Sequence, residues 1–571
     1  MITRRGFIEI AAATAAVTGL GGRLGRAAAA GALSQDDLLR FTPKGQLTLL
    51  HLADCHAQLE PIYYREPSHN LGVGAARGRA PHLTGEAFLK AFGIPAHSPE
   101  AYMLTSADYE ALARSYGRVG GMDRMATLVK AIRAERGADR VLLLDGGDLV
   151  QGSYTSLESK GADMIAVAKA LGIEATTGHW EFTLGEERIV ELFGTIQRPG
   201  SSGIPFLAGN VRDTDFAEPV FHSTRMFERG GLQVAVIGQA FPYTPIANPR
   251  WMIPRWSFGI REGEVRKSVA AARRSGADVV VLLSHNGFDV DRKLASRVEG
   301  IDVILAAHTH DAVPVPVRVN RTLLIASGSH GKFLSRLDLE VKNGAVTDFA
   351  YRLLPLLSDA ITPDADMARL IDGIRAPHAD LLKTELARTE GLLYRRDTFS
   401  GTLDDVICDA LLAQREAEIV FSPGFRWGAS LPAGQPITWD DVYNATAVTY
   451  PAAYRVHMSG EAIKAVLEDV ADNLFNPDPY YQQGGDMVRT GGLGFTIDVD
   501  ARIGRRISSL HLVGSGAAID AGKEYVVAGW GSINENTEGP PVWEPLAAYL
   551  KDRQVISARA PKNVKFLRAA N

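Results

Sequence analysis

Residues 47–56 read LTLLHLADCH, a short and mainly apolar run that ends in a cluster of polar side chains. Its apolar part, residues 47–52, has the length and character of a buried strand. Similar runs occur at residues 141–144, 234–237, 279–283, 303–306 and 323–326, and helical patterns occur at 121–136, 162–171 and 261–275. Because strands alternate with helices, the region predicts a layered α/β domain.

Polar residues stand directly after four of the predicted strands. In α/β sheets, ligands bind just outside the carboxyl ends of the strands, so we expect these residues to meet at one rim. They are Asp54, His56, Asp148, His285, His308 and His310.

These residue types favour a metal site. Imidazole and carboxylate groups together suit manganese, zinc or iron. Two such ions about 3.5–4 Å apart need a bridging carboxylate, and they activate a water between them. Any one of these histidines alone could be structural, and Asp145 or Asp148 alone could be a turn residue. Their recurrence after four strands favours a binuclear hydrolase.

Length and composition narrow the class of protein. A chain of 571 residues is too long for one hydrophobic core, which predicts two or three domains. The 46% apolar and 22% charged residues are ordinary for a soluble globular protein. Lys and Arg are spread along the chain, so the net charge of −5 indicates no nucleic-acid partner. No internal stretch is long and apolar enough for stable membrane insertion, and we expect a monomer.

The N-terminus is typical of an exported protein. It begins MITRRGF, continues with an Ala-rich run to about Leu20, and has four alanines at 27–30. This layout predicts a twin-arginine export signal over residues 1–30 and a periplasmic location, with an unrelated basic tail as the alternative. Cys55 and Cys408 are too few for a disulfide framework, and we expect two buried free thiols.

The rest of the chain divides into segments of different character. Residues 58–120 are rich in Gly, Pro, His and Tyr and have little regular period, which indicates an insertion shaping the mouth of the active site. We expect a catalytic domain over residues 45–357, a helical linker over 358–383 and a second domain of mixed character over 384–571.

The order of the motifs resembles a known family. The motifs are Asp-x-His at 54–56, Gly-Gly-Asp at 146–148, Gly-His-Trp at 178–180, Ser-His-Asn-Gly at 284–287 and Ala-His-Thr-His at 307–310. They resemble the calcineurin-like metallophosphoesterases and, more narrowly, the two-domain 5′-nucleotidases, over about residues 46–567. The resemblance implies an α/β (α+β) fold, with a four-layered α/β/β/α metallophosphatase domain and a nucleotidase-type C-terminal domain for substrate binding.

The resemblance also divides the ligands between two metal ions. One ion would bind Asp54, His56, Asp148 and His310. The other would bind Asp148 as the bridge, His179, His285 and His308.

One run departs from the nucleotidase pattern. Nucleotidases carry Asn, a ligand, and then a catalytic His after the Gly, whereas this chain reads Gly178-His179-Trp180-Glu181. With the insertion and the export signal, this run resembles the thiosulfohydrolase family of the Sox sulfur-oxidation system (SoxB). That resemblance implies two manganese ions, with zinc or iron as alternatives. It also implies release of sulfate from a cysteine S-thiosulfonate on the arm of the carrier protein SoxYZ.

The resemblance suggests roles for two further residues. A nucleotidase expels an alkoxide, for which an acidic His is worth on the order of 10²–10⁴-fold. A persulfide leaves as an anion, so Trp180 could replace that His and form a wall beside the carrier arm. Arg426, in the run Pro423-Gly424-Phe425-Arg426-Trp427, matches the phosphate-binding Arg of nucleotidases. Its guanidinium would bind the sulfonate, with a surface salt bridge as the alternative.

Two other functions remain open from the sequence. The first is a periplasmic 5′-nucleotidase or a related phosphomonoesterase. The second is a non-catalytic protein that binds metal only for stability.

Overall fold

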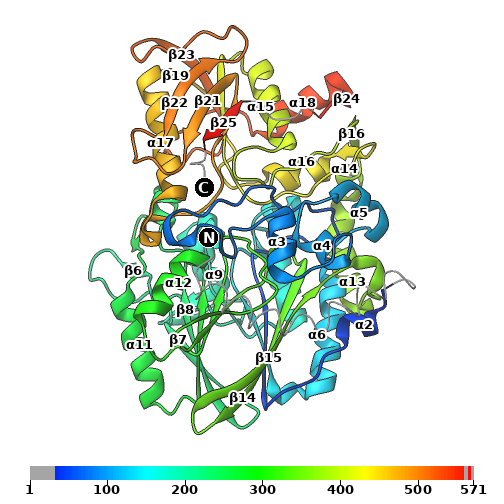
Figure 1. Ribbon diagram of the computed structural model, residues 1–571, viewed down its shortest axis with the longest axis vertical. Coiled ribbons are helices and arrows are strands. Elements are labelled where there is room, and N and C mark those ends of the chain that lie inside the picture. Colours follow the sequence, from blue (N-terminus) through cyan, green and yellow to red (C-terminus); the bar gives the residue numbers. More distant parts are fainter. Residues whose placement is uncertain (1–32, 559–562, 568–571) are drawn as a thin grey trace. The chain divides into compact units, whose positions relative to one another are not determined.

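The computed structural model describes residues 33–558 and 563–567 (Figure 1), so the predicted export signal at 1–30 lies outside the described residues. The chain forms two compact units. The first contains the described residues up to Ile62 together with Gly85–Gln151 and Glu158–Ala376. The second contains Tyr63–Thr84, Gly152–Leu157 and the described residues from Pro377 onward.

Two sheets form the centre of the first unit. The strands of the first sheet are, in spatial order, β15 (Ala345–Pro355), β14 (Phe333–Lys342), β1 (Leu47–Leu52), β2 (Val141–Asp145) and β3 (Ala175–Thr176). Those of the second are β12 (Val317–Val319), β13 (Thr322–Ala326), β11 (Val303–Ala306), β10 (Val279–Ser284), β8 (Leu232–Gln239) and β7 (Thr224–Arg229). Within the first sheet β1, β2 and β3 are parallel, and within the second β8, β10, β11 and β13 are parallel, so the carboxyl ends of each set lie at one edge.

Side chains alternate between two cores along these strands. Leu47 and Leu49 of β1 belong to a core that contains residues of both sheets and therefore lies between them. Leu50 and Leu52 belong to a second core on the opposite face, shared with α6 (Met122–Arg136), α8 (Ala162–Leu171) and α13 (Ala365–Arg375). This period of two is what a strand buried on both faces requires.

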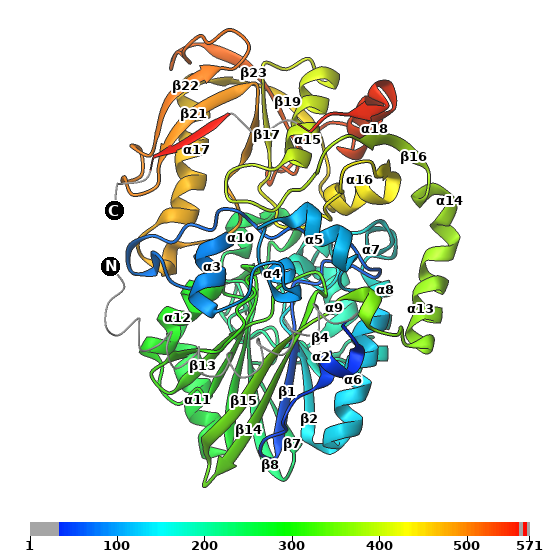
Figure 2. The ribbon, with the colours of Figure 1, turned by 45° about the vertical axis from the view of Figure 1, so that its right-hand side comes forward.

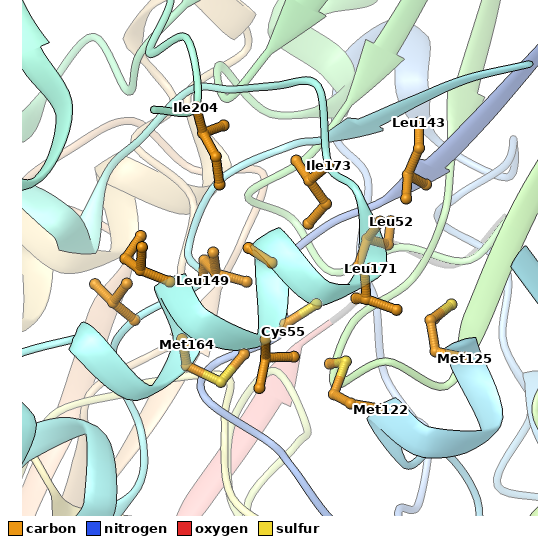
Figure 3. Packing of buried hydrophobic residues seen from close by; sticks show 14 of the residues in the cluster. Leu52, Cys55, Met122, Met125, Leu143, Leu149, Met164, Leu171, Ile173 and Ile204 are labelled. Carbon is orange, nitrogen blue, oxygen red and sulfur yellow. The ribbon is translucent and has the colours of Figure 1, made fainter. Parts of the chain in front are cut away.

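Helices cover the outer face of each sheet (Figure 2). The helix-side core of the first sheet is shown in Figure 3, where Leu52 and Leu143 pack with Met122 and Met125 of α6. On the second sheet, α11 (Glu262–Arg274) contacts β8 and β10, and α12 (Phe288–Arg297) contacts β11 and β13. The predicted four-layered α/β/β/α order is confirmed.

The bounds of the predicted elements agree closely with the structure. The six predicted strands and three predicted helices are all present, with ends within two residues of the prediction. The insertion is more ordered than its sequence indicates, since it contains α3 (Gly85–Phe92), α4 (Pro99–Leu104) and α5 (Tyr109–Tyr116). These helices are short, and too few turns repeat for a clear 3.6-residue period.

The described residues of the second unit form three sheets. Their strand orders are β18 (Pro436–Thr438), β16 (Glu385–Thr389), β24 (Val555–Ile556); β19 (Tyr454–Ser459), β23 (Glu524–Gly529), β17 (Ile419–Ser422), β20 (Arg489–Gly491); and β22 (Ile507–Leu512), β21 (Leu493–Asp498), β25 (Val564–Leu567). Helix α17 (Gly460–Phe475) shares a core with β17 and β21, and Val73 from the insertion is buried in that core. The segment 63–84 is therefore part of the packing of this unit.

The two cysteines are free and buried, which confirms the expected thiols. Cys55 lies in the helix-side core of the first unit (Figure 3). Among the residues that the structure describes, no helix has the length and apolar character needed to cross a membrane.

Removing a side chain from the helix-side core should destabilise the first unit. Leu143 is fully buried in that core, so Leu143→Ala should lower the free energy of unfolding by about 2–5 kcal/mol. Urea-induced unfolding measures this change. The matched control is Ile196→Ala, because Ile196 is 42% exposed, and it should change stability by no more than about 0.5 kcal/mol. Equal losses in the two variants would contradict this description of the core.

Candidate metal centre

The loops after five parallel strands, β1, β2, β3, β10 and β11, deliver polar side chains to one edge of the first unit. The seven predicted ligands fall into two buried groups that share Asp148, and the ligand atoms within each group lie within 4.8 Å of one another. One group is Asp54, His56, Asp148 and His310, and the other is Asp148, His179, His285 and His308. The structure thus brings together the sets that the resemblance implied, while their role as ligands stays a prediction.

The backbone of these loops is strained. Five of the seven residues have left-handed φ angles, which are uncommon for residues other than Gly: Asp54 (51°), His56 (47°), Asp148 (55°), His308 (77°) and His310 (59°). Such strain persists only where the surroundings enforce it, and it concentrates at functional sites.

Hydrogen bonds between the loops hold this backbone in place. The amide of Asp54 donates to the carbonyl of Gly147 at 2.9 Å, and the amide of His56 donates to the carbonyl of Asp148 at 2.8 Å. The amide of His308 donates to Oδ1 of Asp54 at 2.9 Å. The loops after β1, β2 and β11 therefore fix one another.

In the first group, imidazole and carboxylate atoms face one another. Nδ1 of His56 lies 3.0 Å from the carbonyl of Gln151, so it carries the hydrogen, and Nε2 presents its lone pair to the group. That Nε2 lies 3.0 Å from Nε2 of His310 and 3.7 Å from Oδ2 of Asp148. A lone pair that faces a carboxylate without water is unfavourable, and a cation between them relieves the repulsion.

The second group has the same character with one difference. Nδ1 of His285 lies 2.6 Å from the carbonyl of Gly146, and its Nε2 lies 3.1 Å from Oδ2 of Asp148. His179 is turned the other way: its Nδ1 lies 3.3 Å from Oδ2 of Asp148, and its Nε2 lies 3.1 Å from Oδ1 of Asn248. His308 completes the group, with its ring centroid 5.3 Å from that of His285.

Burial and neighbouring charges shift the pKa values of these groups. Burial raises the pKa of Asp54 well above its ordinary value and lowers the pKa of His56 to about 4. Burial also opposes ionisation of Asp148, but His285 and His179 outweigh it and hold the pKa of Asp148 well below its ordinary value. Burial disfavours the charged form of His285, yet Asp148 and Asp54 raise its pKa to about 10. The buried carboxylates therefore demand positive charge, and the donor set fits divalent ions of the manganese, zinc and iron type.

Two more side chains support the ligand loops and were not assigned a role from the sequence. Oε1 of buried Glu181 accepts from the amide of Leu149 at 2.7 Å, and Oε2 accepts from the amide of His179 at 2.8 Å. The ring of His330 lies beside those of His56 and His310, at centroid distances of 5.7 and 5.8 Å. Only the position of Glu181, next to the Gly-His-Trp motif, gave any signal in the sequence.

Trp180 is buried and holds Asp148 through its backbone. Its amide donates to Oδ1 of Asp148 at 2.8 Å, and its ring centroid lies 5.3 Å from that of His179. An indole has only a donor N–H and does not titrate near neutral pH. The side chain at this position therefore supplies no acid.

Arg426 lies in the second unit, in the loop after β17. Its Nε lies 3.1 Å from Oδ1 of Asp486, and one terminal nitrogen donates to the carbonyl of Gly485 at 2.5 Å. Asp486 is buried and also pairs with Arg396 and Arg489. The pair is thus not a surface salt bridge, and binding of an anion by Arg426 stays a prediction.

Substitution of the shared carboxylate should weaken both ion sites. Asp148→Asn removes the one charge common to the two groups, so metal analysis should find fewer than two ions per chain, against two in the unsubstituted protein. The matched control is Asp366→Asn, because that side chain is 76% exposed, and it should keep two ions. Two ions in Asp148→Asn would contradict the sharing of Asp148.

Comparisons with known proteins agree with this geometry. Residues 385–543 match the model of the 5′-nucleotidase C-terminal domain. Rat 5′-nucleotidase is 24% identical over 69% of this chain and 73% of its own length. A solved 5′-nucleotidase precursor of Thermus thermophilus is 21% identical, with a TM-score of 0.71 over 92% of this chain and all of that one. The two proteins therefore have similar folds.

A second solved structure is much more similar. It is the sulfate thiohydrolase SoxB of Thermus thermophilus, which is 38% identical, with a TM-score of 0.89 over 93% of this chain and 98% of that one. This identity over nearly the whole of both chains shows the family. The chain belongs to the SoxB family, a hydrolase family within the two-domain 5′-nucleotidase superfamily of calcineurin-like metallophosphoesterases.

Proposed function

We propose that this protein is a periplasmic dimetal thiosulfohydrolase. Its substrate would be a cysteine S-thiosulfonate on the arm of the carrier SoxYZ, its product sulfate, and its metal two manganese ions, with zinc or iron as alternatives. The observation that carries the proposal is the pair of ligand groups sharing Asp148, with His179 and Trp180 at positions where nucleotidases carry Asn and His. The 38% identity with a protein described as a sulfate thiohydrolase supports it.

The reaction is a hydrolysis at sulfur. The oxygen of water attacks the sulfonate sulfur, the bond between that sulfur and the carrier sulfur breaks, and its electron pair leaves with the carrier as a persulfide. The water protons pass to solvent, and sulfate is the second product, so no oxidant is needed. When bound, two divalent ions supply an acidified water and positive charge for the anion.

The residue types around the site suit this leaving group. An alkoxide needs a proton as it leaves, whereas a persulfide is acidic enough to leave as an anion. Trp180 has no such proton to give, and its buried ring lies beside His179 of the second ligand group. We assign Trp180 to the wall of the substrate site, where an apolar ring would shield the sulfonate from bulk solvent.

Arg426 is our candidate for the oxyanion in the second unit. A guanidinium presents a planar fork of donors that fits a three-oxygen sulfonate as it fits phosphate. Asp486 also pairs with two further arginines, so Arg426 belongs to a cluster of three guanidinium groups around one buried carboxylate. Such a cluster is a suitable environment for an anion.

A 5′-nucleotidase is the second candidate, because the C-terminal family model and the curated relatives both carry that description. The Trp at position 180 argues against it, since the position has no acid for an alkoxide. A non-catalytic metal-binding protein is the third candidate. It would release neither sulfate nor phosphate in the assay below, whereas either enzyme would release one of them.

The product of turnover distinguishes these functions. Manganese-loaded protein should release sulfate from thiosulfonated SoxYZ, and little phosphate from nucleoside monophosphates. A chelator should abolish sulfate release, and added manganese should restore it. Phosphate release as the main activity would favour the nucleotidase, and neither product from protein with two bound ions would favour the non-catalytic reading.

Restoring the nucleotidase residue should shift the balance of activities. Trp180→His supplies an acid, so the ratio of phosphate-monoester to sulfonate hydrolysis should rise, by up to about 10²-fold. The two rates are measured by phosphate and sulfate release from the same preparation. Trp439→His in the second unit is the matched control and should leave the ratio unchanged. A marked rise in sulfonate hydrolysis in Trp180→His would refute the leaving-group argument.

A further inference from the structure

The histidines of the two ligand groups are oriented by different kinds of partner. His56 and His285 each place Nδ1 against a backbone carbonyl, of Gln151 at 3.0 Å and of Gly146 at 2.6 Å. His179 instead places Nε2 against a side chain, Oδ1 of Asn248, at 3.1 Å. Asn248 lies in the loop between α10 (Thr244–Ala247) and the 3₁₀ turn η4 (Arg250–Met252).

The partner of a ligand histidine decides which ring nitrogen can bind a metal. The binding nitrogen must carry a lone pair, so the other nitrogen carries the hydrogen and needs an acceptor. Nδ1 of His179 is the nitrogen that faces Asp148, at 3.3 Å from Oδ2. Nε2 must then be the N–H, and the amide oxygen of Asn248 must face it.

His179 and Asn248 are both buried, so water cannot replace the hydrogen bond between them. His179 is 4% exposed and Asn248 is 2% exposed. A buried N–H that loses its acceptor costs about 1–3 kcal/mol. The ring of Phe241 packs on His179, at a centroid distance of 4.1 Å. Without Asn248 the ring of His179 would therefore stay in place. The tautomer with hydrogen on Nδ1, which cannot bind the metal through Nδ1, would compete with the tautomer that can.

The loop of Asn248 is tied to the loop of His179. The amide of Asn248 donates to the carbonyl of Thr244 at 3.0 Å, and the hydroxyl of Thr244 donates to the carbonyl of Phe241 at 2.8 Å. The amide of Phe241 donates to the carbonyl of Gly178 at 3.0 Å. This chain of bonds sets the distance between Asn248 and His179.

We propose that Asn248 is the positioning residue that makes His179 a ligand through Nδ1. In the family resemblance, the ligand Asn of nucleotidases corresponds to His179 of this chain. An amide binds a metal through its oxygen without the loss of a proton. Such a ligand has no second tautomer, so no residue at position 248 is needed to select one. The His at 179 and the Asn at 248 therefore form one unit, and this inference rests on the proposed dimetal function.

A double-mutant cycle tests the pairing, with the affinity of each manganese ion as the readout. Asn248→Leu removes the acceptor at similar volume and should weaken one of the two ions about 10–100-fold, while the affinity of the other ion changes little. Asn248→Asp keeps an oxygen acceptor and should bind both ions about as the unsubstituted protein does. Isothermal titration calorimetry of metal-free protein measures both affinities.

The cycle is completed in the His179→Asn background. There, Asn248→Leu should cause no further loss of this kind, because an amide binds the ion through its oxygen and has no ring tautomer for Asn248 to select. Asn534→Leu, at an exposed position of the second unit, is the surface control and should change neither affinity. Should Asn248→Leu fail to fold, Asn248→Ala carries the same expectation.

Three results would overturn the inference. They are an equal loss in the two backgrounds, an equal weakening of both ions, and an Asn248→Asp variant as weak as Asn248→Leu. Each would indicate a general packing role. If the unsubstituted protein binds two ions but Asn248 and His179 show no such coupling, only this inference fails. If the unsubstituted protein binds no ion, the proposed function fails as well.

Discussion

One carboxylate group, that of Asp148, is the feature on which the site depends. Its Oδ2 lies between 3.1 and 3.7 Å from ring nitrogens of three histidines, His56, His179 and His285. Its Oδ1 accepts the backbone amide of Trp180. A charge that is buried in this way is removed from bulk solvent, so the arrangement is favourable only with positive charge nearby. That requirement connects the fold to metal binding.

The sheets supply the rigidity that this carboxylate needs. In the register of the first sheet Leu52 lies opposite Asp145, so β1 and β2 end side by side. Two separate cores hold the strands, one between the sheets and one under the helices. The loops beyond can then keep left-handed backbone at Asp54 and Asp148, because the strands and inter-loop hydrogen bonds enforce it.

The sequence predicted the parts of the site that depend on local pattern. Apolar runs located the strands, and strand ends located six ligands, since parallel strands must end at one edge. His179 follows no long strand and was found only through the family resemblance. Asn248 lies 69 residues further along the chain, and nothing in its own neighbourhood marks it, because its role comes from a contact between two distant loops. Glu181 stands next to the Gly-His-Trp motif, but its contacts are with backbone amides, so its role could not be predicted from residue types.

The differences between the predicted and the observed fold also arise from contacts between distant parts of the chain. The helices of the insertion are too short for a clear period, and the docking of residues 63–84 into the second unit depends on tertiary contacts such as Val73 in its core. The environment of Arg426 could not be predicted either, because Asp486 reaches it from a distant loop. The residue type was visible from the family motif, while its buried charge network was not.

The position of the ions themselves tests the central claim most directly. Anomalous diffraction at the manganese edge, from crystals of manganese-loaded protein, should show two peaks about 3.5–4 Å apart. Asp148 should bind both ions, and Nδ1 of His179 should bind one of them. A single peak, or two ions of which only one contacts Asp148, would contradict the account.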